Sequence, residues 1–342
     1  MDPSPVTMRA VLQPNSHAPT LTLTTVPVPE VDLSAGEHLI RVHATSPCKG
    51  ELDWWRMVET MDLPLPASKQ FIPCFDLAGT VVKGPTDSPF QPGEAVFART
   101  NAFRTGNAAE FAVALAKELA KKPRNLSWVE AASVSLSALT AYQALFQHGG
   151  LDVRALEGEE EARKRNSEVR LLITAASGGV GSWTLQLARE AGVKNIIAVC
   201  STNNVDMVAG LGATEVIDYR KTTMGAWMTA AGEQPLPDIV LDCVGGETLS
   251  QCWLVAKAGG TLMSIVVPPE TLKPERDVRE GVNGVFFIMD PNGEQLQAIG
   301  KLIEDERCRP IVDSVYALED FQGAFNRVEA GHARGKVVIT LT

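Results

Sequence analysis

The chain has 342 residues, of which 45% are hydrophobic and 21% charged, and its 41 acidic and 31 basic side chains give a net charge of −10. This composition is typical of a globular protein with room for two domains, and the negative charge argues against nucleic acid or an anionic membrane as a partner. The six cysteines show no C-x-x-C spacing, the N-terminus lacks a secretory pattern, and no stretch is apolar enough for a membrane helix. We therefore expect a soluble cytoplasmic protein with reduced thiols.

The first 120 or so residues predict mostly β structure. Short apolar runs such as "EHLIRVHATS", "GTVVKG" and "GEAVFAR" are bounded by turn residues. An alanine-rich stretch from residue 128 then predicts helix and is closed by Gly149 and Gly150. Residues 152–168 are charged throughout and lack apolar periodicity, so we expect a solvated loop there.

From Val169 the pattern alternates between strand and helix. Short all-apolar strands such as "VRLLITA", "NIIAVC" and "PDIVLDCV" are separated by helical segments such as "SWTLQLAREAG". This alternation predicts a parallel sheet covered on both faces. The chain ends on "GKVVITL", which we expect to return as a strand to the first domain.

The segment "LLITAASGGVGSWTLQLARE" places a glycine-rich turn between a strand and a helix. Glycines there let the backbone approach a pyrophosphate, whose charge is met by free N–H groups and by the positive end of the helix. A tight turn that merely needs small residues is the alternative. The predicted cofactor-binding residues of this loop are Ser177, Gly178, Gly179, Val180 and Gly181.

The end of the next strand favours NADPH over NADH. An NAD-binding protein usually has an Asp or Glu there to hold the ribose 2′-hydroxyl, whereas this chain has hydroxyls and amides, which tolerate a 2′-phosphate. Tyr219 could add a hydrogen bond, and Arg220 and Lys221 positive charge; a polar loop with a core tyrosine is the alternative. The predicted contacts are Ser201, Thr202, Asn203, Asn204 and Tyr219.

The sequence resembles the medium-chain dehydrogenase/reductase superfamily, in its zinc-free branch of quinone oxidoreductase-like and enoyl reductase-like enzymes. The resemblance runs nearly end to end and is carried by "GTVVKG…FQPGEAVFAR", "GNAAEFAVALAKELAKKPRNLSWVEAASVSLSALTAYQALF", "ITAASGGVG", "GATEVIDYRK", "DIVLDCVGG" and "RGKVVITL". It implies an α/β fold in which a GroES-like β-rich catalytic domain (1–125 plus 269–342) is interrupted by a Rossmann doubly wound parallel-sheet domain (126–268). It also implies further cofactor contacts from Thr140, Val244, Ser264, Ile265, Val266 and Phe287.

The resemblance also bears on whether a catalytic zinc is present. Zinc-dependent relatives have a cysteine where Cys48 lies and Gly-His-Glu where this chain has Cys74, Phe75 and Asp76. A catalytic zinc needs three protein ligands, and here Phe75 cannot serve as one. The five histidines show no ligand spacing. We therefore expect no metal, and we expect Cys74 to be a small buried residue.

Without a metal, substrate polarisation depends on hydrogen bonds and positioning. Mitochondrial enoyl reductases of this fold use a tyrosine on the loop after Cys48, which this chain lacks. The titratable residues on that loop are Lys49, Glu51 and Asp53. The candidate catalytic groups that assist protonation are Lys49 and Asp53, and water is the alternative proton source. Aromatic residues are the candidates for the substrate site, with core packing as the alternative: Trp54, Trp55, Phe75, Phe286 and Phe287.

These expectations together predict an NADPH-dependent reductase that transfers hydride to a quinone or to the C=C of an α,β-unsaturated carbonyl. Two alternatives remain: a pathway-specific enoyl reductase or related enzyme of specialised metabolism, and a non-catalytic NADPH-binding protein. The expected partner is a small apolar electrophilic substrate. By analogy with the family we also expect a homodimer formed along the edge of the Rossmann sheet, with "GGTLMSIVV" as the pairing strand.

Overall fold

A computed structural model describes residues 5–15, 18, 20–56, 71–232 and 234–341. The chain divides into two compact units, the first made of Met1–Leu139 with Asp290–Thr342 and the second of Thr140–Met289. Both borders lie further along the chain than predicted. Helix α2 (Trp128–Ala132) packs against strands of the first unit, and β13 (Asn283–Phe286) joins the sheet of the second.

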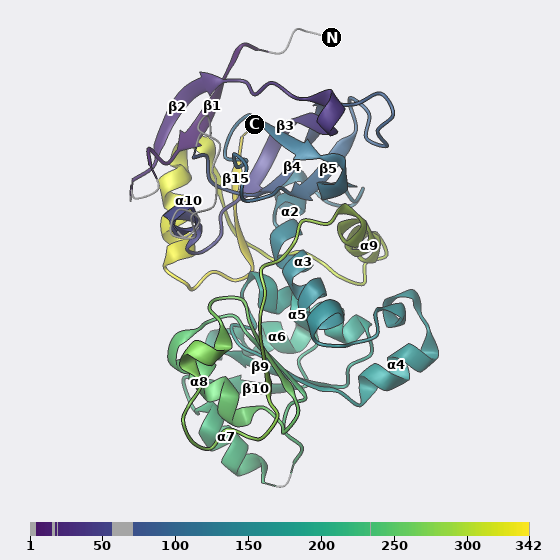
Figure 1. Cartoon of the computed structure of the whole chain (residues 1–342), viewed down its shortest axis with the longest axis vertical. Coiled ribbons are helices and arrows are strands. Elements are labelled where there is room, and N and C mark those ends of the chain that lie inside the picture. The colour runs from purple at the N-terminus through teal and green to yellow at the C-terminus, as the bar shows by residue number, and fades with distance from the viewer. Residues whose placement is uncertain (1–4, 16–17, 19, 57–70, 233, 342) are drawn as a thin grey trace. The chain divides into compact units, whose positions relative to one another are not determined.

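The first unit is built on a mainly antiparallel sheet with the order β14-β15-β3-β4-β5-β7, in which β6 also pairs with β3. Strands β1 and β2 form a separate hairpin. The C-terminal elements α10 and β15 lie in the same unit as the N-terminal strands, so the last strand does return as predicted (Figure 1). Apolar side chains such as Ile40, Leu77, Val96 and Ile339 form its buried core.

The strands of the first unit are β1 (Thr7–Leu12), β2 (Thr22–Pro27), β3 (Glu37–Ser46), β4 (Asp76–Lys83), β5 (Ala95–Arg99), β6 (Phe111–Leu115), β7 (Leu119–Lys121), β14 (Val312–Ala317) and β15 (Lys336–Thr340). Its helices are α2, α9 (Gly293–Glu304), α10 (Phe321–Glu329) and the short turns η1 (Leu33–Ala35), η2 (Glu51–Asp53), η3 (Ala116–Glu118) and η8 (Leu318–Asp320). Helix α3 (Ser135–Gln143) crosses the border between the units.

The second unit is a parallel sheet with the order β10-β9-β8-β11-β12-β13. This is the strand order of a Rossmann fold, in which a dinucleotide binds at the carboxyl ends of the strands. The core is formed by strand residues such as Leu172 and Val240 together with Trp253 of helix α8 (Gly246–Val255). The predicted Rossmann-type parallel sheet is confirmed.

The strands of the second unit are β8 (Arg170–Ile173), β9 (Asn195–Cys200), β10 (Glu215–Asp218), β11 (Ile239–Asp242), β12 (Thr261–Ser264) and β13. Its helices are α4 (Glu160–Ser167), α5 (Gly179–Glu190), α6 (Val205–Leu211), α7 (Met224–Ala231) and α8 (Gly246–Val255), with the short turns η4 (Ala144–His148), η5 (Val153–Glu157), η6 (Thr202–Asn204) and η7 (Pro269–Leu272).

The prediction of a loop at residues 152–168 is wrong, because η5 and α4 form there. Helix α4 begins with acidic residues and ends with basic ones, which complements the helix dipole. It buries only Ala162, Asn166 and Ser167, and such a narrow buried stripe leaves no apolar period in the sequence. Arg165 also pairs with Asp152 at 2.5 Å.

The predicted pairing strand "GGTLMSIVV" contains β12, which lies inside the sheet between β11 and β13. The prediction that it forms a sheet edge is therefore wrong. The edge strands of this sheet are β10 and β13, and Phe286 is exposed on β13. Whether two copies associate along that edge stays a prediction. No helix in the described ranges is long and apolar enough to cross a bilayer.

Candidate functional site

Strand pairing in the first unit brings charged residues together at one end of four neighbouring strands, β15, β3, β4 and β5. Asp76 opens β4 and lies opposite Ser46 at the end of β3, and its other neighbour is Arg99 at the end of β5. Lys336 opens β15, which pairs with β3 on the other side. With Glu51 of η2 these residues form what we call the buried charge cluster: Glu51, Asp76, Arg99 and Lys336, each at most 7% exposed.

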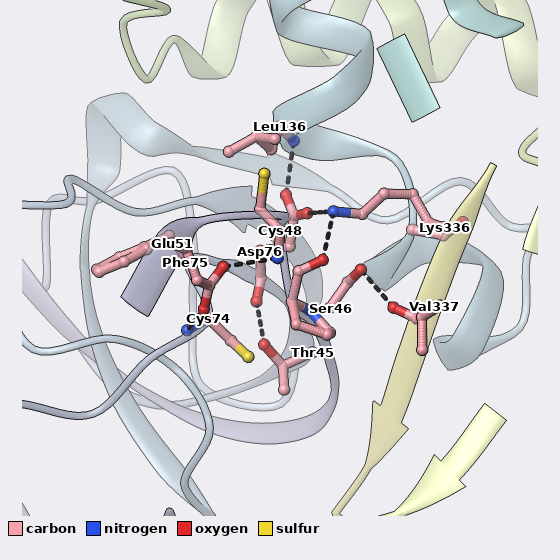
Figure 2. Close-up of polar contacts among 12 residues, drawn as sticks. Thr45, Ser46, Cys48, Glu51, Cys74, Phe75, Asp76, Leu136, Lys336 and Val337 are labelled. Carbon is pink, nitrogen blue, oxygen red and sulfur yellow. Dashed lines mark hydrogen bonds and ion pairs between the residues drawn. The ribbon is translucent and has the colours of Figure 1, made fainter. Parts of the chain in front are cut away.

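An ion pair between Asp76 and Lys336 is central to the buried charge cluster (Figure 2). The Lys336 ammonium lies 3.2 Å from Asp76 Oδ2 and donates a hydrogen bond to the carbonyl of Pro47 at 3.0 Å. The other oxygen, Asp76 Oδ1, accepts the backbone N–H of Leu136 at 2.6 Å. Burial raises the pKa of Asp76, and the charge of Lys336 offsets part of that rise. Both carboxylate oxygens are therefore already engaged by donors.

Glu51 joins the two loops that flank this pair. Its carboxylate accepts the backbone N–H of Cys48 at 2.7 Å and that of Cys74 at 2.6 Å (Figure 2). No ion pair to a cation is recorded for Glu51 within the described part of the chain. Burial raises the pKa of Glu51 to about 7, although the two N–H groups favour its charged form.

Two thiols border the buried charge cluster. Burial raises the pKa of Cys48 to about 11 and that of Cys74 well above its usual value, so both are protonated at neutral pH. Cys74 is fully buried, as predicted, but its backbone is left-handed with φ of 65°. That region favours glycine, so the conformation is strained for a cysteine.

Aromatic residues cover Arg99. Its guanidinium lies 5.2 Å from the centroid of Phe75 and 5.9 Å from that of Trp54, and these two rings stack on each other at 5.8 Å. Trp54 is partly exposed, whereas Trp55 is 2% exposed and packs edge-on against Phe71. Of the two adjacent tryptophans, only Trp54 is therefore available to a ligand, and Phe75 supports it from below the surface.

The two predicted catalytic residues lie outside the buried charge cluster. Lys49 is exposed, and Asp53 is exposed and forms an ion pair with Arg56 at 2.7 Å. Gly50, whose φ is 73°, directly precedes the short turn η2, and Glu51, which lies between the two predicted residues in the sequence, is buried. Whether Lys49 or Asp53 delivers a proton stays a prediction. The residues that sequence reasoning passed over are Glu51, Arg99 and Lys336.

The donor chemistry at Cys48 and Asp76 does not fit a zinc ion. Within the described ranges no group of three or more His, Cys, Asp or Glu is placed to hold a metal; His17 lies outside these ranges. Phe75 occupies the position of the expected histidine ligand and packs against Trp54 and Arg99, and the carboxylate of Asp76 is held by Lys336 and by Leu136.

The glycine-rich turn of the second unit lies between β8 and α5, as predicted. Gly181 has to be glycine because a Cβ there would meet the carbonyl oxygen of Ala175 at 2.4 Å. The close approach turns the chain directly into α5, a helix of 12 residues whose first N–H groups face the end of the sheet. Such a turn suits the pyrophosphate of a dinucleotide.

The loop after β9 carries hydroxyl and amide groups, and its neighbouring carboxylate is occupied. Thr202 donates its hydroxyl to Asp218 at 2.7 Å, and Asp218 also pairs with Lys221 at 3.3 Å. Tyr219 is 52% exposed, and the guanidinium of Arg220 lies over its ring. The carboxylate that ends β10 therefore supports this loop instead of facing outward.

The other predicted cofactor residues end or follow strands of the same sheet, except for Thr140, which lies on α3. Val244 follows β11 and Val266 follows β12, and both are exposed. Ile265 is partly exposed, while Ser264 and Thr140 are buried and Phe287 stacks against His148 at 4.4 Å. Phe286, predicted to bind substrate, is 37% exposed on β13.

Comparison with known proteins agrees with this architecture. Residues 34–124 match the family model described as alcohol dehydrogenase GroES-like domain, and residues 211–339 match that of zinc-binding dehydrogenase. A probable zinc-binding oxidoreductase, mitochondrial, of Arthroderma benhamiae is 45% identical over 98% of this chain and 97% of its own. A chloroplastic quinone-oxidoreductase of Triphysaria versicolor is 32% identical over 97% of this chain and 98% of its own.

Among solved structures, the quinone oxidoreductase of Coxiella burnetii superposes with a TM-score of 0.77, at 24% identity, over 98% of this chain and 100% of its own. That likeness concerns the fold. Zinc appears in the names of one family model and one relative, yet the residues here do not fit a zinc site. The GroES-like and Rossmann units and the relatives' identity lead to one conclusion: the chain is an oxidoreductase of the medium-chain dehydrogenase/reductase superfamily, in its quinone oxidoreductase-like branch, with a nicotinamide cofactor site.

Proposed function

We propose that this enzyme is an NADPH-dependent reductase that works without a metal and transfers hydride to a quinone or to the C=C of an α,β-unsaturated carbonyl. The observation that carries the proposal is the Asp76–Lys336 ion pair, because it engages the carboxylate that a metal site would need. Simple alcohol oxidation benefits from a Lewis acid on the alkoxide. Quinones and enones are already electron-poor and accept hydride without one.

The choice of NADPH rests on the second unit. The turn directly after β9, residues 201–204, carries no carboxylate, and Asp218 at the end of the neighbouring strand β10 is held by Thr202 and Lys221. A 2′-phosphate would therefore meet hydroxyl, amide and basic groups instead of a carboxylate whose negative charge repels it. A bound nicotinamide would supply the hydride, and the residues of the chain would hold the cofactor and exclude water. The chloroplastic relative, named for quinone oxidation and reduction, is consistent with this acceptor class.

The aromatic surface of the first unit suits a flat acceptor. Trp54 is partly exposed and stacks on Phe75, and the Arg99 guanidinium lies 5.9 Å from the centroid of Trp54 and 5.2 Å from that of Phe75. Stacking on such a surface favours apolar planar molecules over small aliphatic ones. We therefore expect a naphthoquinone or an aromatic enone to be reduced faster than a simple ketone.

The test is the loss of NADPH absorbance with a panel of a naphthoquinone, an aromatic enone, a 2-alkenal and a simple ketone, run in parallel with NADH and with a chelator. We expect turnover of the quinone or enone with NADPH, unchanged by the chelator. Inactivation by the chelator and recovery on adding zinc would overturn the metal-free mechanism. Tight NADPH binding without turnover of any acceptor would leave a non-catalytic binder.

Alanine at Lys49 and at Asp53 tests the predicted proton donors. Both side chains are exposed and Asp53 already pairs with Arg56, so we expect both variants to fold as the wild type does. A rate within about twofold of wild type would remove that residue as the proton donor. The measurement is kcat in H2O and in D2O for each variant. A loss of tenfold or more with an altered solvent isotope effect would show that one of them does deliver the proton.

A further inference from the structure

One amide side chain links the two loops at the ends of β8 and β9. The nitrogen Nδ2 of Asn204 donates to Ser177 Oγ at 2.9 Å and to Ser201 Oγ at 3.2 Å. Ser177 belongs to the glycine-rich turn after β8, and Ser201 directly follows β9. Because β8 and β9 are adjacent parallel strands, Asn204 bridges two loops at the cofactor edge of the sheet.

The side-chain amide of Asn204 can be placed in two orientations, which differ in the polar group that is left without a hydrogen bond. As it stands, Oδ1 is buried and has no hydrogen-bond partner. The reversed amide would bury an NH2 group with two donors and no acceptor in its place. An unpaired carbonyl oxygen is tolerated more readily than unpaired N–H groups, so the orientation in which Asn204 donates to both serines is favoured.

This orientation fixes what the two hydroxyls can do. A serine hydroxyl has one proton to donate, and when it accepts from an amide that proton has to go elsewhere. In the described part of the chain, neither Ser177 Oγ nor Ser201 Oγ has a recorded protein acceptor, and both residues are partly exposed. Both protons are thus available to solvent or to a ligand.

The neighbouring threonine behaves differently. Thr202 spends its hydroxyl proton on Asp218, which also accepts the backbone N–H of Arg220 at 3.0 Å. The hydroxyl proton of Thr202 is therefore used within the protein. The hydroxyl protons of Ser177 and Ser201 remain available to a bound molecule. A phosphate can only accept hydrogen bonds, whereas a ribose 2′-hydroxyl can donate or accept, so a pair of committed donors favours the phosphate.

We propose that Asn204 is a positioning residue for cofactor choice: by donating to Ser177 and Ser201, it turns both hydroxyls into donors for the phosphorylated ribose and so favours NADPH over NADH. This inference rests on the proposed function, which names NADPH. It adds the residue that creates the preference and the way in which it acts, through the two serines.

The experiment is equilibrium titration of NADPH and NADH, followed by nucleotide fluorescence, on the wild type, Asn204→Leu, Ser177→Ala/Ser201→Ala and the triple variant. We expect Asn204→Leu to weaken NADPH binding roughly tenfold, the effect of one charge-assisted hydrogen bond, and to change NADH less than about twofold. In the Ser177→Ala/Ser201→Ala background, Asn204→Leu should have no further effect on the ratio of the two Kd values.

Two further variants keep the result interpretable. Asn204→Asp is nearly isosteric and accepts from both hydroxyls, so we expect it to lower the NADPH preference at least as much as Asn204→Leu. Gln186→Leu removes a buried amide from α5, away from the two serines, and should leave the Kd ratio unchanged. A wild type that prefers NADH would overturn the proposed cofactor and this inference with it. The inference alone would be overturned if the wild type prefers NADPH but the Asn204 variants leave the ratio of the two Kd values unchanged. It would also be overturned if the effect of an Asn204 change adds to that of the serine changes.

Discussion

Replacing Lys336 with methionine should lower the free energy of unfolding by about 3–5 kcal/mol, the usual cost of removing one partner of a buried ion pair. Asp76 is 1% exposed and Lys336 7% exposed, so the carboxylate of Asp76 would be left charged and unpaired out of reach of water. Urea unfolding of the wild type and of Lys336→Met at neutral pH measures the difference.

The double variant Asp76→Asn/Lys336→Met shows whether the unpaired charge is the cause. Asparagine keeps an acceptor for the Leu136 N–H and carries no charge, so we expect the double variant to regain most of the loss. Lys121→Met breaks the exposed ion pair with Glu94 and should cost less than about 1 kcal/mol. Equal losses in the buried and exposed cases, or no recovery in the double variant, would contradict this account.

The stability of the wild type relative to Glu51→Gln should fall by about 3 kcal/mol as the pH rises from 4.5 to 8. Burial raises the pKa of Glu51 from its ordinary 4.5 to about 7 in the folded protein. Between these values the folded state holds a proton that the unfolded chain has released, so raising the pH favours unfolding. The loss begins above the unfolded pKa and is complete above the folded one.

The comparison with glutamine isolates this titration. Glutamine at position 51 is neutral at every pH, and its NH2 group cannot accept, so one of the two backbone hydrogen bonds is lost at every pH. The charged and titratable groups that face Glu51 are present in both proteins: Cys48, Cys74, Asp76, Arg99 and Lys336. A stability difference that stays flat or grows with pH, in urea titrations at four pH values, would show that Glu51 is ionised throughout.

Features set by local sequence were predictable. The glycine-rich turn lies between β8 and α5, and the order of strands and helices after it gives the parallel sheet. Glycine spacing and apolar runs act over a few residues, so they are visible in the sequence. The helix at Glu160–Ser167 was missed because charges at its two ends, instead of an apolar stripe, favour it.

The buried charge cluster could not be predicted in the same way. Lys336 and Asp76 lie far apart in the sequence and meet only because β15 and β4 both pair with β3. One signal was present, since Lys336 opens the otherwise apolar strand "KVVIT", where a charge needs a partner if it is buried. For Glu51 no such signal exists, because the turn at Gly50 decides which of three neighbouring charged side chains faces inward.

Cys74 has a consequence for engineering this enzyme. Its φ of 65° is the torsion angle that a glycine adopts without strain, and glycine is what the zinc-dependent relatives have there. The loop before β4 therefore already has a backbone on which Gly-His could replace Cys74 and Phe75 without rebuilding the chain. A designer who wants a metal here has to change side chains only, and the one that then needs attention is Lys336, which already holds the carboxylate of Asp76.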